Sequence, residues 1–378
     1  MTKITIAISN MSLGGAQRVI STLINYLSGK GWDITLLTME QSSATSFYYL
    51  EPSIKYFRLG IAGYSPSLLS ALQNNLKRIY TLRQGIRHSQ PDVVISFVDE
   101  MNVVALLAIR GLNIPVIVSV RTDPAVSPLS RSWQQLRKWT YSWADKIVVL
   151  SETAKNFFSP KLQSRISIIP NAALPPKVEK NISGQQLAKP AMIAAGRLAE
   201  EKRFDLLLQA FAKIKDRHPQ WTLTILGEGE LRPELESLRE QLGLCDRVYL
   251  PGAVKNLYEF LQQADLFVMS SRFEGFPNAL CEAMACGLPV ISTDCPSGPR
   301  EIIRDGVDGI LVPNEDVEAL SSAMDRLMSD EKERQRLAVR ATEVIERFSL
   351  EKVMGMWEAV IKEAIGESEG WKSNSNNL

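Results

Sequence analysis

The second half of the chain contains a buried strand, a loop, a helix and a second strand in close succession. This order restricts the fold more than any other feature. Residues 265–269 form an apolar run typical of a strand inside a parallel sheet. The loop that follows contains Gly275 and Pro277, and Asn278 occupies the position of a helix N-cap. Residues 279–286 have a helical pattern, which a glycine and a proline end before the next apolar run. We therefore predict an α/β unit with parallel strands.

The same alternation occurs in two series along the 378 residues, which is enough chain for two domains. We predict an N-terminal α/β domain over 1–170, a linker over 171–190 rich in Pro, Lys, Ser and Asn, and a second α/β domain over 191–348. A helix over 349–365 is expected to return toward the first domain, and the polar tail 366–378 is expected to be disordered. The loops at the carboxyl ends of the strands should face a cleft between the domains.

Two carboxylates belong to the strand–loop–helix stretch. Glu274 lies in the loop beyond the strand, and Glu282 lies about one turn into the helix. Ligands of an open α/β sheet bind outside the carboxyl ends of its strands, so both are candidate binding groups. The alternative is a solvated loop residue and an ordinary helix residue. For Glu282 this alternative is weakened because its helix neighbours are nearly all apolar, namely Ala279, Leu280, Ala283 and Met284.

Three further segments contain candidate contacts to a nucleotide. Arg197 and Lys202 follow a predicted strand, and Lys202 is placed at the start of a helix, where two cations and the helix dipole favour a pyrophosphate. The backbone of residues 252–256 is free to bind the edge of a base. Gly14 and Gly15 follow the first strand and form either a plain tight turn or an anion-binding loop, because they lack the third glycine of the dinucleotide fingerprint.

The net charge of +1 conceals an uneven distribution of charge. Residues 1–175 contain 18 Lys and Arg against 9 Asp and Glu, whereas the remainder contains 25 against 33. The basic half favours an anionic partner, such as an anionic membrane surface, a phosphorylated acceptor or nucleic acid. No RNA- or DNA-binding module is recognisable, so we expect no nucleic acid. The aromatic and basic helix over 131–143 either packs on the sheet or lies against lipid headgroups.

Residue counts disfavour several kinds of site. His88 and His218 are the only histidines, and both fall at polar helix ends, so we expect surface positions and no His-based triad, metal site or general base. The four cysteines have no CxxC spacing, which favours buried free thiols. There is no Asp-x-Asp, and we expect no metal and no cofactor.

No apolar run approaches the roughly 20 residues of a membrane-spanning helix. The first three residues lead directly into a strand, which does not fit a signal peptide. We therefore expect a cytoplasmic protein, either free or peripheral on the cytosolic face of the membrane.

Several short motifs follow one another along the chain in an order that is typical of one family. They are Gly-Gly near the N-terminus, Gly-Arg-Leu at 196–198, Glu-Lys at 201–202, Gly-Glu-Gly at 227–229, and a Glu-x7-Glu block from Glu274 to Glu282. In this order they resemble the GT-B retaining glycosyltransferases of family 4, the glycosyl transferases group 1. The resemblance covers both domains and is most specific over 190–313. It implies two Rossmann-like α/β domains that face a cleft, with the acceptor bound by the first and a nucleotide sugar by the second.

The resemblance also implies roles for particular residues. Arg197 and Lys202 would hold the donor diphosphate, and Glu282 would hold the nucleotide ribose. Glu274 would contact the transferred sugar or its phosphate, and Arg197, Lys202 and Glu274 would form the catalytic group. The backbone of Gly15 would approach the β-phosphate. The complete set expected to bind the donor is Gly15, Arg197, Lys202, Gly252, Val254, Glu274, Gly275, Phe276, Asn278 and Glu282.

One position departs from the pattern of the family. Many relatives carry a histidine in the loop after the strand that matches residues 116–120, whereas this chain has Arg121, Thr122 and Asp123 there. Arg121 or Asp123 is expected to contact the donor or the acceptor in its place. The front-face mechanism proposed for the family needs no histidine, because the leaving phosphate itself accepts the proton of the acceptor.

The implied activity is retaining, metal-independent transfer of a hexose or N-acetylhexosamine from a nucleotide diphosphate sugar, with UDP favoured over GDP. The implied acceptor is a glycan or a polyprenyl-diphosphate-linked oligosaccharide in the synthesis of cell-surface polysaccharide or lipopolysaccharide. The alternative is a non-catalytic subunit that binds a sugar nucleotide or a glycan on the same fold. An epimerase or a phosphorylase could also share the architecture.

Overall fold

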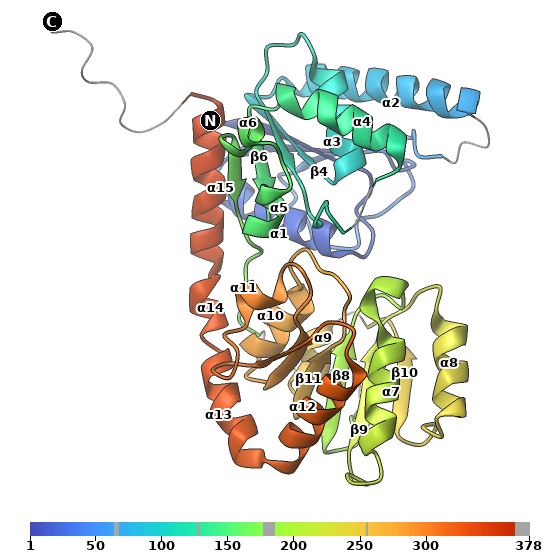
Figure 1. Cartoon of the computed structure of the whole chain (residues 1–378). Helices are drawn as coiled ribbons and strands as arrows, with labels where there is room; N and C mark the ends of the chain where they lie inside the picture. The colour runs from blue at the N-terminus through green and yellow to red at the C-terminus, as the bar shows by residue number, and fades with distance from the viewer. Residues whose placement is uncertain (64–67, 127–128, 177–185, 255, 367–378) are drawn as a thin grey trace, which may run out of the picture. The chain divides into compact units, whose positions relative to one another are not determined.

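The computed structural model describes residues 1–63, 68–126, 129–176, 186–254 and 256–366. The chain divides into two compact units, each with its own sheet (Figure 1). Unit 1 comprises Met1–Pro170 and the C-terminal segment from Glu351, and unit 2 comprises Asn171–Leu350.

The segment predicted as a linker belongs to unit 2 where it is described. Asn171 and Ala173 are buried, and the backbone N–H of Ala173 donates to the carbonyl of Phe348 over 2.8 Å. The middle of this segment, residues 177–185, and the predicted tail from residue 367 lie outside the described residues.

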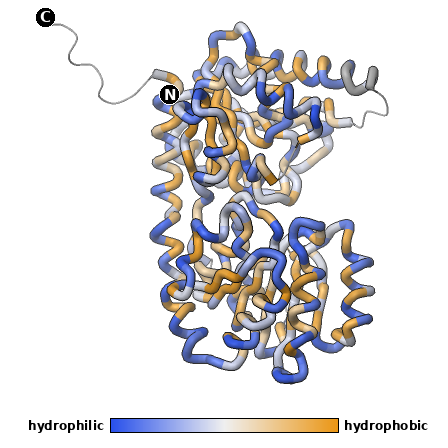
Figure 2. Tube along the Cα trace, in the orientation of Figure 1, coloured by the Kyte–Doolittle hydropathy of each residue, from blue (hydrophilic) through white to orange (hydrophobic). Residues whose placement is uncertain are grey.

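Unit 1 is built on a seven-stranded sheet with the order β3-β2-β1-β4-β5-β6-β7, in which every neighbouring pair is parallel. The central strands are buried over nearly their whole length because helices cover both faces of the sheet. Apolar runs of this kind are the orange stretches of Figure 2. The strands are β1 (Lys3–Ile8), β2 (Asp33–Thr38), β3 (Lys55–Arg58), β4 (Val93–Phe97), β5 (Val116–Ser119), β6 (Lys146–Val149) and β7 (Ile166–Ile168).

The apolar faces of α2, α3 and α4 pack in one core cluster against the sheet of unit 1, so these three helices form a layer on one face (Figure 1). The helices of this unit are α1 (Gly15–Gly29), α2 (Leu68–Ser89), α3 (Asp99–Ile109), α4 (Arg131–Thr140), the short 3-10 helix Tyr141–Trp143, α5 (Glu152–Asn156), α6 (Pro160–Gln163) and α15 (Leu350–Ala364).

Helix α15 is the last described element, and from Glu351 onward it belongs to unit 1. Trp357 is fully buried, and its ring centre lies 5.7 Å from that of Phe97 at the end of β4. Two salt bridges, Lys30 with Glu358 and Lys146 with Glu363, tie the polar side of the helix to the same unit. Its buried residues recur at the three- and four-residue spacing of an amphipathic helix and are Val353, Met354, Trp357, Val360 and Ile361.

Unit 2 is built on a six-stranded parallel sheet with the order β10-β9-β8-β11-β12-β13. Its core includes the fully buried rings of Phe211 and Trp221. The strands are β8 (Ala191–Ala195), β9 (Thr222–Leu226), β10 (Val248–Gly252), β11 (Leu266–Met269), β12 (Val290–Thr293) and β13 (Ile310–Val312). The helices are the short 3-10 helix Glu200–Lys202, α7 (Phe204–Ile214), α8 (Arg232–Gln241), α9 (Leu257–Leu261), α10 (Asn278–Ala285), α11 (Pro299–Ile302), α12 (Val317–Ser329), α13 (Glu331–Ala341) and α14 (Val344–Arg347).

Both sheets have the doubly wound topology that the strand–helix alternation predicts, so the prediction of two Rossmann-like α/β units is confirmed. In unit 1 the order of the strands reverses direction between β1 and β4, and in unit 2 it reverses between β8 and β11. No helix in the described part of the chain is long and apolar enough to cross a membrane.

Candidate functional site

The candidate site lies at the carboxyl edge of the sheet in unit 2, where the strand order reverses. From β8 the chain proceeds outward through β9 to β10, and from β11 it proceeds in the opposite direction through β12 to β13. Strands β8 and β11 are direct neighbours, so the loops that leave their carboxyl ends begin side by side. Open α/β sheets bind their ligands at this reversal.

Lys202, from the loop after β8, and Glu274, from the loop after β11, form an ion pair there. The distance between Lys202 Nζ and Glu274 Oε1 is 2.5 Å, and both side chains are largely buried. The Ser271 hydroxyl also donates to Glu274 Oε1, over 2.7 Å. A Cβ at Gly196 would lie 3.1 Å from Cε of Lys202, so the lysine stem packs on the glycine backbone. The sequence placed both charges at this edge, and the structure brings them into contact.

Lys202 does not begin a helix as predicted. It is the last residue of the short 3-10 helix Glu200–Lys202, and α7 begins two residues later at Phe204. The intervening residue, Arg203, has a left-handed backbone, which turns the chain between the two helices.

Arg197 is the most exposed charged residue of the predicted catalytic group. Its Nη2 atom lies 2.5 Å from Glu201 Oε1, and 65% of its side chain is exposed. The hydrogen bond to Glu201 raises the pKa of Arg197. Partial burial tends to raise the pKa of Glu201, but the hydrogen bond from Arg197 and the charges of Arg197 and Lys202 outweigh it and hold that pKa below its ordinary value. Glu201 therefore orients an arginine that keeps most of its guanidinium open to a ligand.

The loops after β8 and β9 approach each other backbone to backbone. A Cβ at Gly227, whose φ is +152°, would lie 1.8 Å from the carbonyl oxygen of Gly196, and one at Gly229 would lie 2.3 Å from that of Leu198. The backbone N–H of Leu198 donates to the carbonyl of Glu228 over 2.9 Å. The two glycines of the Gly-Glu-Gly motif are therefore required for packing, and this packing places Arg197.

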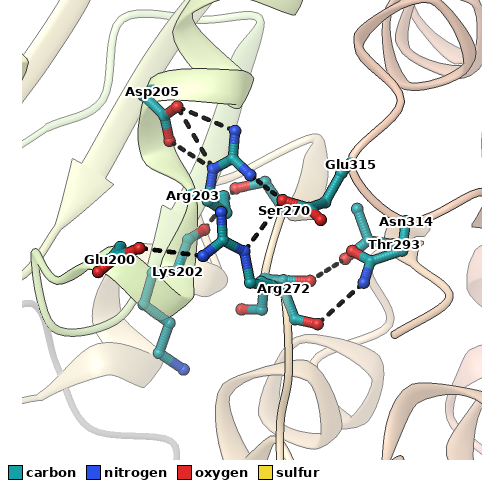
Figure 3. Close-up of polar contacts among 10 residues, drawn as sticks. Glu200, Lys202, Arg203, Asp205, Ser270, Arg272, Thr293, Asn314 and Glu315 are labelled. Atoms are coloured by element: carbon teal, nitrogen blue, oxygen red, sulfur yellow. Dashed lines mark hydrogen bonds and ion pairs between the residues drawn. The ribbon is translucent and has the colours of Figure 1, made fainter. Parts of the chain in front are cut away.

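A second set of ionic contacts joins three loops next to Lys202 (Figure 3). Arg203 pairs with Asp205 and with Glu315, and Arg272 pairs with the same oxygen of Glu315 and with Glu200. We call Arg203, Arg272 and Glu315 the loop brace. Its members come from the loops after β8, β11 and β13, so it ties together the segments that carry Lys202 and Glu274.

Two hydrogen bonds to backbone carbonyls join two of the loops that the loop brace connects. The Ser270 hydroxyl donates to the carbonyl of Lys202 over 2.8 Å, and the backbone N–H of Arg272 donates to the carbonyl of Glu201 over 2.8 Å. Arg203 and Glu315 both have positive φ angles, +49° and +58°, which are costly for residues with a side chain. Sequence reasoning did not identify the loop brace, because Arg203, Arg272 and Glu315 carry no motif and meet only through the order of the strands.

Helix α10 contributes Glu282 and its own N-terminus to this edge. Glu282 is only 2% exposed, so the prediction that it points to a specific place rather than to bulk solvent agrees with its position. Asn278 is not the N-cap as predicted. It is the first residue of α10, Pro277 precedes it without a capping hydrogen bond, and Asn278 Oδ1 accepts from Asn171 Nδ2 over 2.7 Å. Phe276 is buried, with its ring centre 5.4 Å from that of Phe348.

The predicted base-binding backbone begins at Gly252, the last residue of β10. Its φ is +102°, and a Cβ there would lie 2.8 Å from Glu228 Oε1. The carbonyl of Gly252 accepts from the N–H of Gly227 over 2.9 Å, so that group already has a partner. Val254 is half-exposed, and residue 255 lies outside the described residues. Binding roles for Gly252, Val254 and Gly275 stay predictions.

In unit 1, Gly14 and Gly15 lie at the corresponding reversal, directly after β1. Gly15 is the first residue of α1, and the Tyr48 hydroxyl donates to the carbonyl of Gly14 over 2.9 Å. Arg121 and Asp123 follow β5 at the same edge of the sheet. Burial lowers the pKa of Arg121 to about 9, so its guanidinium is a cation at neutral pH.

Asp123 is buried, and its two carboxylate oxygens differ in their hydrogen bonds. Its Oδ1 accepts from the N–H of Ala125 over 2.9 Å, whereas Oδ2 has no hydrogen-bond partner among the described residues. Contact of Arg121 or Asp123 with the donor or the acceptor stays a prediction.

Sequence reasoning missed a buried polar cluster beside this edge. Asp99 Oδ1 accepts from the Tyr141 hydroxyl over 2.8 Å and from Arg137 over 3.4 Å. Burial, and then the Asp99 charge, raise the pKa of Tyr141 well above its ordinary value, so its hydroxyl remains a donor. Val98, which precedes Asp99, has a φ of +75°, an outlier for a β-branched residue. The only sequence signal was an acidic pair directly after a strand.

The expectations that His218 lies on the surface and that all four cysteines are buried were wrong. His218 is buried, not on the surface, and its Nε2 lies 2.7 Å from Asp325 Oδ1. His88 is exposed, as expected. Cys245 is exposed, Cys286 is half-buried, and Cys281 and Cys295 are buried, so the prediction of buried free thiols holds for two of the four.

The arrangement in unit 2 can hold a doubly charged anion. Arg197 and Lys202 supply cations, and the first N–H groups of α10 lack intrahelical partners, as at every helix start. Charge-assisted hydrogen bonds of this kind are the usual means of binding phosphate. In the described part of the chain, no group of three or more His, Cys, Asp or Glu is placed to hold a metal ion.

Comparison with known proteins agrees with this geometry. The family model described as Glycosyl transferases group 1 matches residues 177–344, and the model described as Glycosyltransferase Family 4 matches residues 13–173. An uncharacterized glycosyltransferase of Methanocaldococcus jannaschii is 31% identical over an alignment of 342 residues that covers 77% of this chain and 84% of the relative. The chain belongs to the group 1, family 4 glycosyltransferases.

Two further proteins are similar to this glycosyltransferase along almost its whole length. One, from Campylobacter jejuni, is named GalNAc-alpha-(1->4)-GalNAc-alpha-(1->3)-diNAcBac-PP-undecaprenol alpha-1,4-N-acetyl-D-galactosaminyltransferase. It is 28% identical over 367 residues, 96% of this chain and 99% of the relative. The other is the HepE protein of Anabaena, solved in complex with UDP and glucose. It superposes with a TM-score of 0.77 at 17% identity, over 96% of this chain and 100% of that chain, which supports the GT-B fold.

Proposed function

We propose that this glycosyltransferase moves a hexose or N-acetylhexosamine from a nucleotide diphosphate sugar to a glycan or lipid-linked oligosaccharide, with retention of the α configuration. The observation that carries the proposal is the meeting of Lys202 with Glu274 at the reversal of the sheet, with Arg197 exposed beside them. The site offers a diphosphate two cations, each of which is oriented by one carboxylate. The named acceptor of the Campylobacter relative supports a lipid-linked glycan, and hence a part in the synthesis of cell-surface polysaccharide.

The chemical requirement of this reaction is charge stabilisation. The diphosphate leaving group gains negative charge as its bond to the sugar breaks. Preorganised donors at the point where charge develops lower the barrier more than any other single effect in many enzymes. Lys202 is held by Glu274 and Gly196, and Arg197 is held by Glu201, so both are oriented before the donor binds. Such donors do not have to reorganise during the reaction.

Glu274 is in direct contact with Lys202, as Glu201 is with Arg197. Its ion pair with Lys202 keeps the lysine side chain over Gly196. We propose that the diphosphate takes over Lys202 when the donor binds, which leaves Glu274 to accept a hydrogen bond from a sugar hydroxyl. Glu282 is proposed to hold the ribose through two hydroxyl hydrogen bonds, the role for which its carboxylate is suited.

A transfer assay with labelled sugar nucleotides and a polyprenyl-diphosphate glycan tests the activity. We expect transfer from a UDP sugar, since UDP occupies the structurally similar HepE protein. A thermal-shift screen across UDP, GDP and their sugars should identify the base, because a ligand that binds only the folded state raises the melting temperature. The anomeric proton of the product, read by NMR, should show the α configuration of the donor. A β product would overturn retention.

We also propose that the reaction needs no metal ion, because Arg197 and Lys202 supply the positive charge at the diphosphate. Dialysis against EDTA should then leave the transfer rate unchanged. Loss of activity that Mg²⁺ or Mn²⁺ restores would contradict this proposal.

The second candidate is a non-catalytic subunit that binds a sugar nucleotide on the same fold. It predicts a thermal shift with the sugar nucleotide but no transfer to any acceptor. The left-handed backbones at Arg203 and Glu315 favour the enzyme, because strain of this kind concentrates at sites of chemistry. An epimerase or a phosphorylase would release or interconvert the sugar without an acceptor.

A further inference from the structure

The outer surface of the helical layer in unit 1 combines exposed apolar side chains with an excess of positive charge. The layer consists of α2, α3 and α4, whose inner faces pack on one side of the sheet. We call eight exposed apolar and basic residues of this layer the outer face. They are Leu76, Lys77, Tyr80 and Arg87 on α2, Arg110 just after α3, and Arg131, Lys138 and Trp139 on α4.

Three large apolar side chains of the outer face are exposed to solvent. Leu76 is 58% exposed, Tyr80 is 63% exposed, and Trp139 is 59% exposed. Leu76 and Tyr80 are four residues apart and therefore lie on the same side of α2, opposite the buried Leu82 and Ile86. Figure 2 shows hydrophobic and hydrophilic residues alternating along α2.

Trp139 is held rigidly at the end of α4. Its ring centre lies 4.6 Å from that of Trp143, and the guanidinium of Arg110 lies 4.7 Å from the Trp143 ring. Exposed apolar residues scattered singly are ordinary, but here they recur on two helices of one layer beside cations. For the aromatic helix over 131–143, packing on the sheet and a position against lipid headgroups were both open. Trp133 and Trp143 pack on the core, whereas Trp139 is exposed.

The charges of the outer face are all positive. Residues 52–91 contain no Asp or Glu, and neither do residues 124–144. Lys77, Arg87 and Lys138 form no salt bridge with any described residue, and the same holds for the two arginines at 110 and 131. Elsewhere in the described chain most exposed arginines are paired, as Arg217 is with Asp325. The outer face therefore has an excess of positive charge, and the one exposed acidic residue among the described residues of the three helices is Glu100 at the start of α3.

A partner that contacts the whole outer face has to reach from α2 to α4. Packed helices lie about 8–10 Å apart, so α2 and α4 on either side of α3 are separated by about 20 Å. Tyr and Trp among Lys and Arg are the residues enriched where a protein meets lipid headgroups, because the ring is apolar at one end and polar at the other.

We propose that the outer face docks unit 1 on an anionic phospholipid bilayer, with Leu76, Tyr80 and Trp139 among the headgroups and the cations over the anionic lipids. The proposal deepens the proposed function, since a lipid-linked acceptor is presented at such a surface. The two are nevertheless tested separately, because vesicle binding needs neither the sugar donor nor the acceptor.

The test measures sedimentation of the full chain with vesicles of phosphatidylcholine alone and with phosphatidylglycerol added. We expect binding only to the anionic vesicles, with a blue shift of tryptophan fluorescence that Trp139→Phe removes. Lys77→Ser with Lys138→Ser should weaken binding about 30-fold, from about 1 kcal/mol for each basic residue near an anionic surface. Trp139→Ser alone should weaken it about tenfold.

A matched control changes the same number of charges elsewhere. Lys161 and Lys332 are exposed and form no salt bridge among the described residues, so Lys161→Ser with Lys332→Ser should leave vesicle binding unchanged. All variants should keep the circular dichroism and the melting temperature of the parent. Equal binding to neutral vesicles, equal loss in the control pair, or binding of single-stranded RNA without binding of vesicles would each overturn the proposal.

Discussion

At the scale of single residues, the candidate site depends on charges that are oriented by other charges. Lys202 is held by Glu274, and Arg197 by Glu201. Each cation is thus preorganised, yet Arg197 is exposed and Lys202 lies at the edge of the sheet where a ligand would enter. The identities of these residues were visible in the sequence, but the pairing of Lys202 with a glutamate 72 positions away was not.

Replacing either cation should reduce turnover while the fold is kept. Removal of one preorganised donor typically costs about 3–4 kcal/mol, or a factor of about 10²–10³ in rate, so we expect this loss in kcat for Arg197→Ala and for Lys202→Ala. The measurement is steady-state transfer of labelled sugar, with thermal unfolding as the check on folding. Lys213→Ala, which removes an exposed ion pair with Glu318 on the surface of unit 2, is the matched control. Near-normal turnover in both variants would contradict the assigned roles.

Glu201 predicts a dependence of stability on pH. Because its pKa is lower in the folded chain than in the unfolded chain, it adds stability above its unfolded pKa of about 4.3, and this stability is lost as pH falls through the folded pKa. The difference in unfolding free energy between the parent and Glu201→Gln should therefore be largest near neutral pH and should shrink below about pH 4. Urea denaturation across this range measures it. A difference that grows with acid would refute the argument.

At the scale of elements, three loops act as one support because the parallel strands bring their carboxyl ends together. The loop brace joins Arg203 and Arg272 through Glu315, and its two left-handed residues are held in place by these ion pairs (Figure 3). Glu315 is 112 positions from Arg203 and 43 from Arg272. No local pattern predicts such contacts, since each residue taken alone resembles a surface charge.

Breaking the loop brace should reduce catalysis through Lys202. Small displacements of positioning groups are costly, so we expect Glu315→Ala to lower kcat about tenfold with a smaller change in the KM of the donor. The effect should disappear when Lys202→Ala is already present, because the two changes then act on one contact. Glu315→Asp should restore part of the rate. Full additivity of the two changes would show that the loop brace acts on stability alone, and Glu318→Ala on α12 serves as the control.

At the scale of the whole molecule, the end of the chain completes the first unit. Helix α15 follows all the elements of unit 2 in sequence, yet from Glu351 it belongs to unit 1 and buries Trp357 in it. Unit 1 therefore cannot complete its core until the rest of the chain has been made.

Trp357→Ala should destabilise unit 1 strongly. Removal of a fully buried aromatic side chain costs about 3–5 kcal/mol, so the unfolding transition of this unit should shift to lower urea concentration. Met356→Ala, at the exposed neighbouring position on the same helix, should change stability by less than about 0.5 kcal/mol. A donor-induced thermal shift that survives in Trp357→Ala would show that unit 2 still binds its ligand. Equal stability of the two variants would refute the packing role.

The amino-acid sequence by itself determined the two α/β units, the motifs at the carboxyl ends of their strands, and the family to which they belong. These follow from local periodicity and from glycines such as Gly227, whose neighbours leave no room for a side chain. Only the tertiary structure decided that Lys202 meets Glu274, that His218 is buried against Asp325, and that Arg203, Arg272 and Glu315 join three loops. The physical reason is that such contacts depend on which strands are neighbours, and strand order is set by packing across the whole sheet.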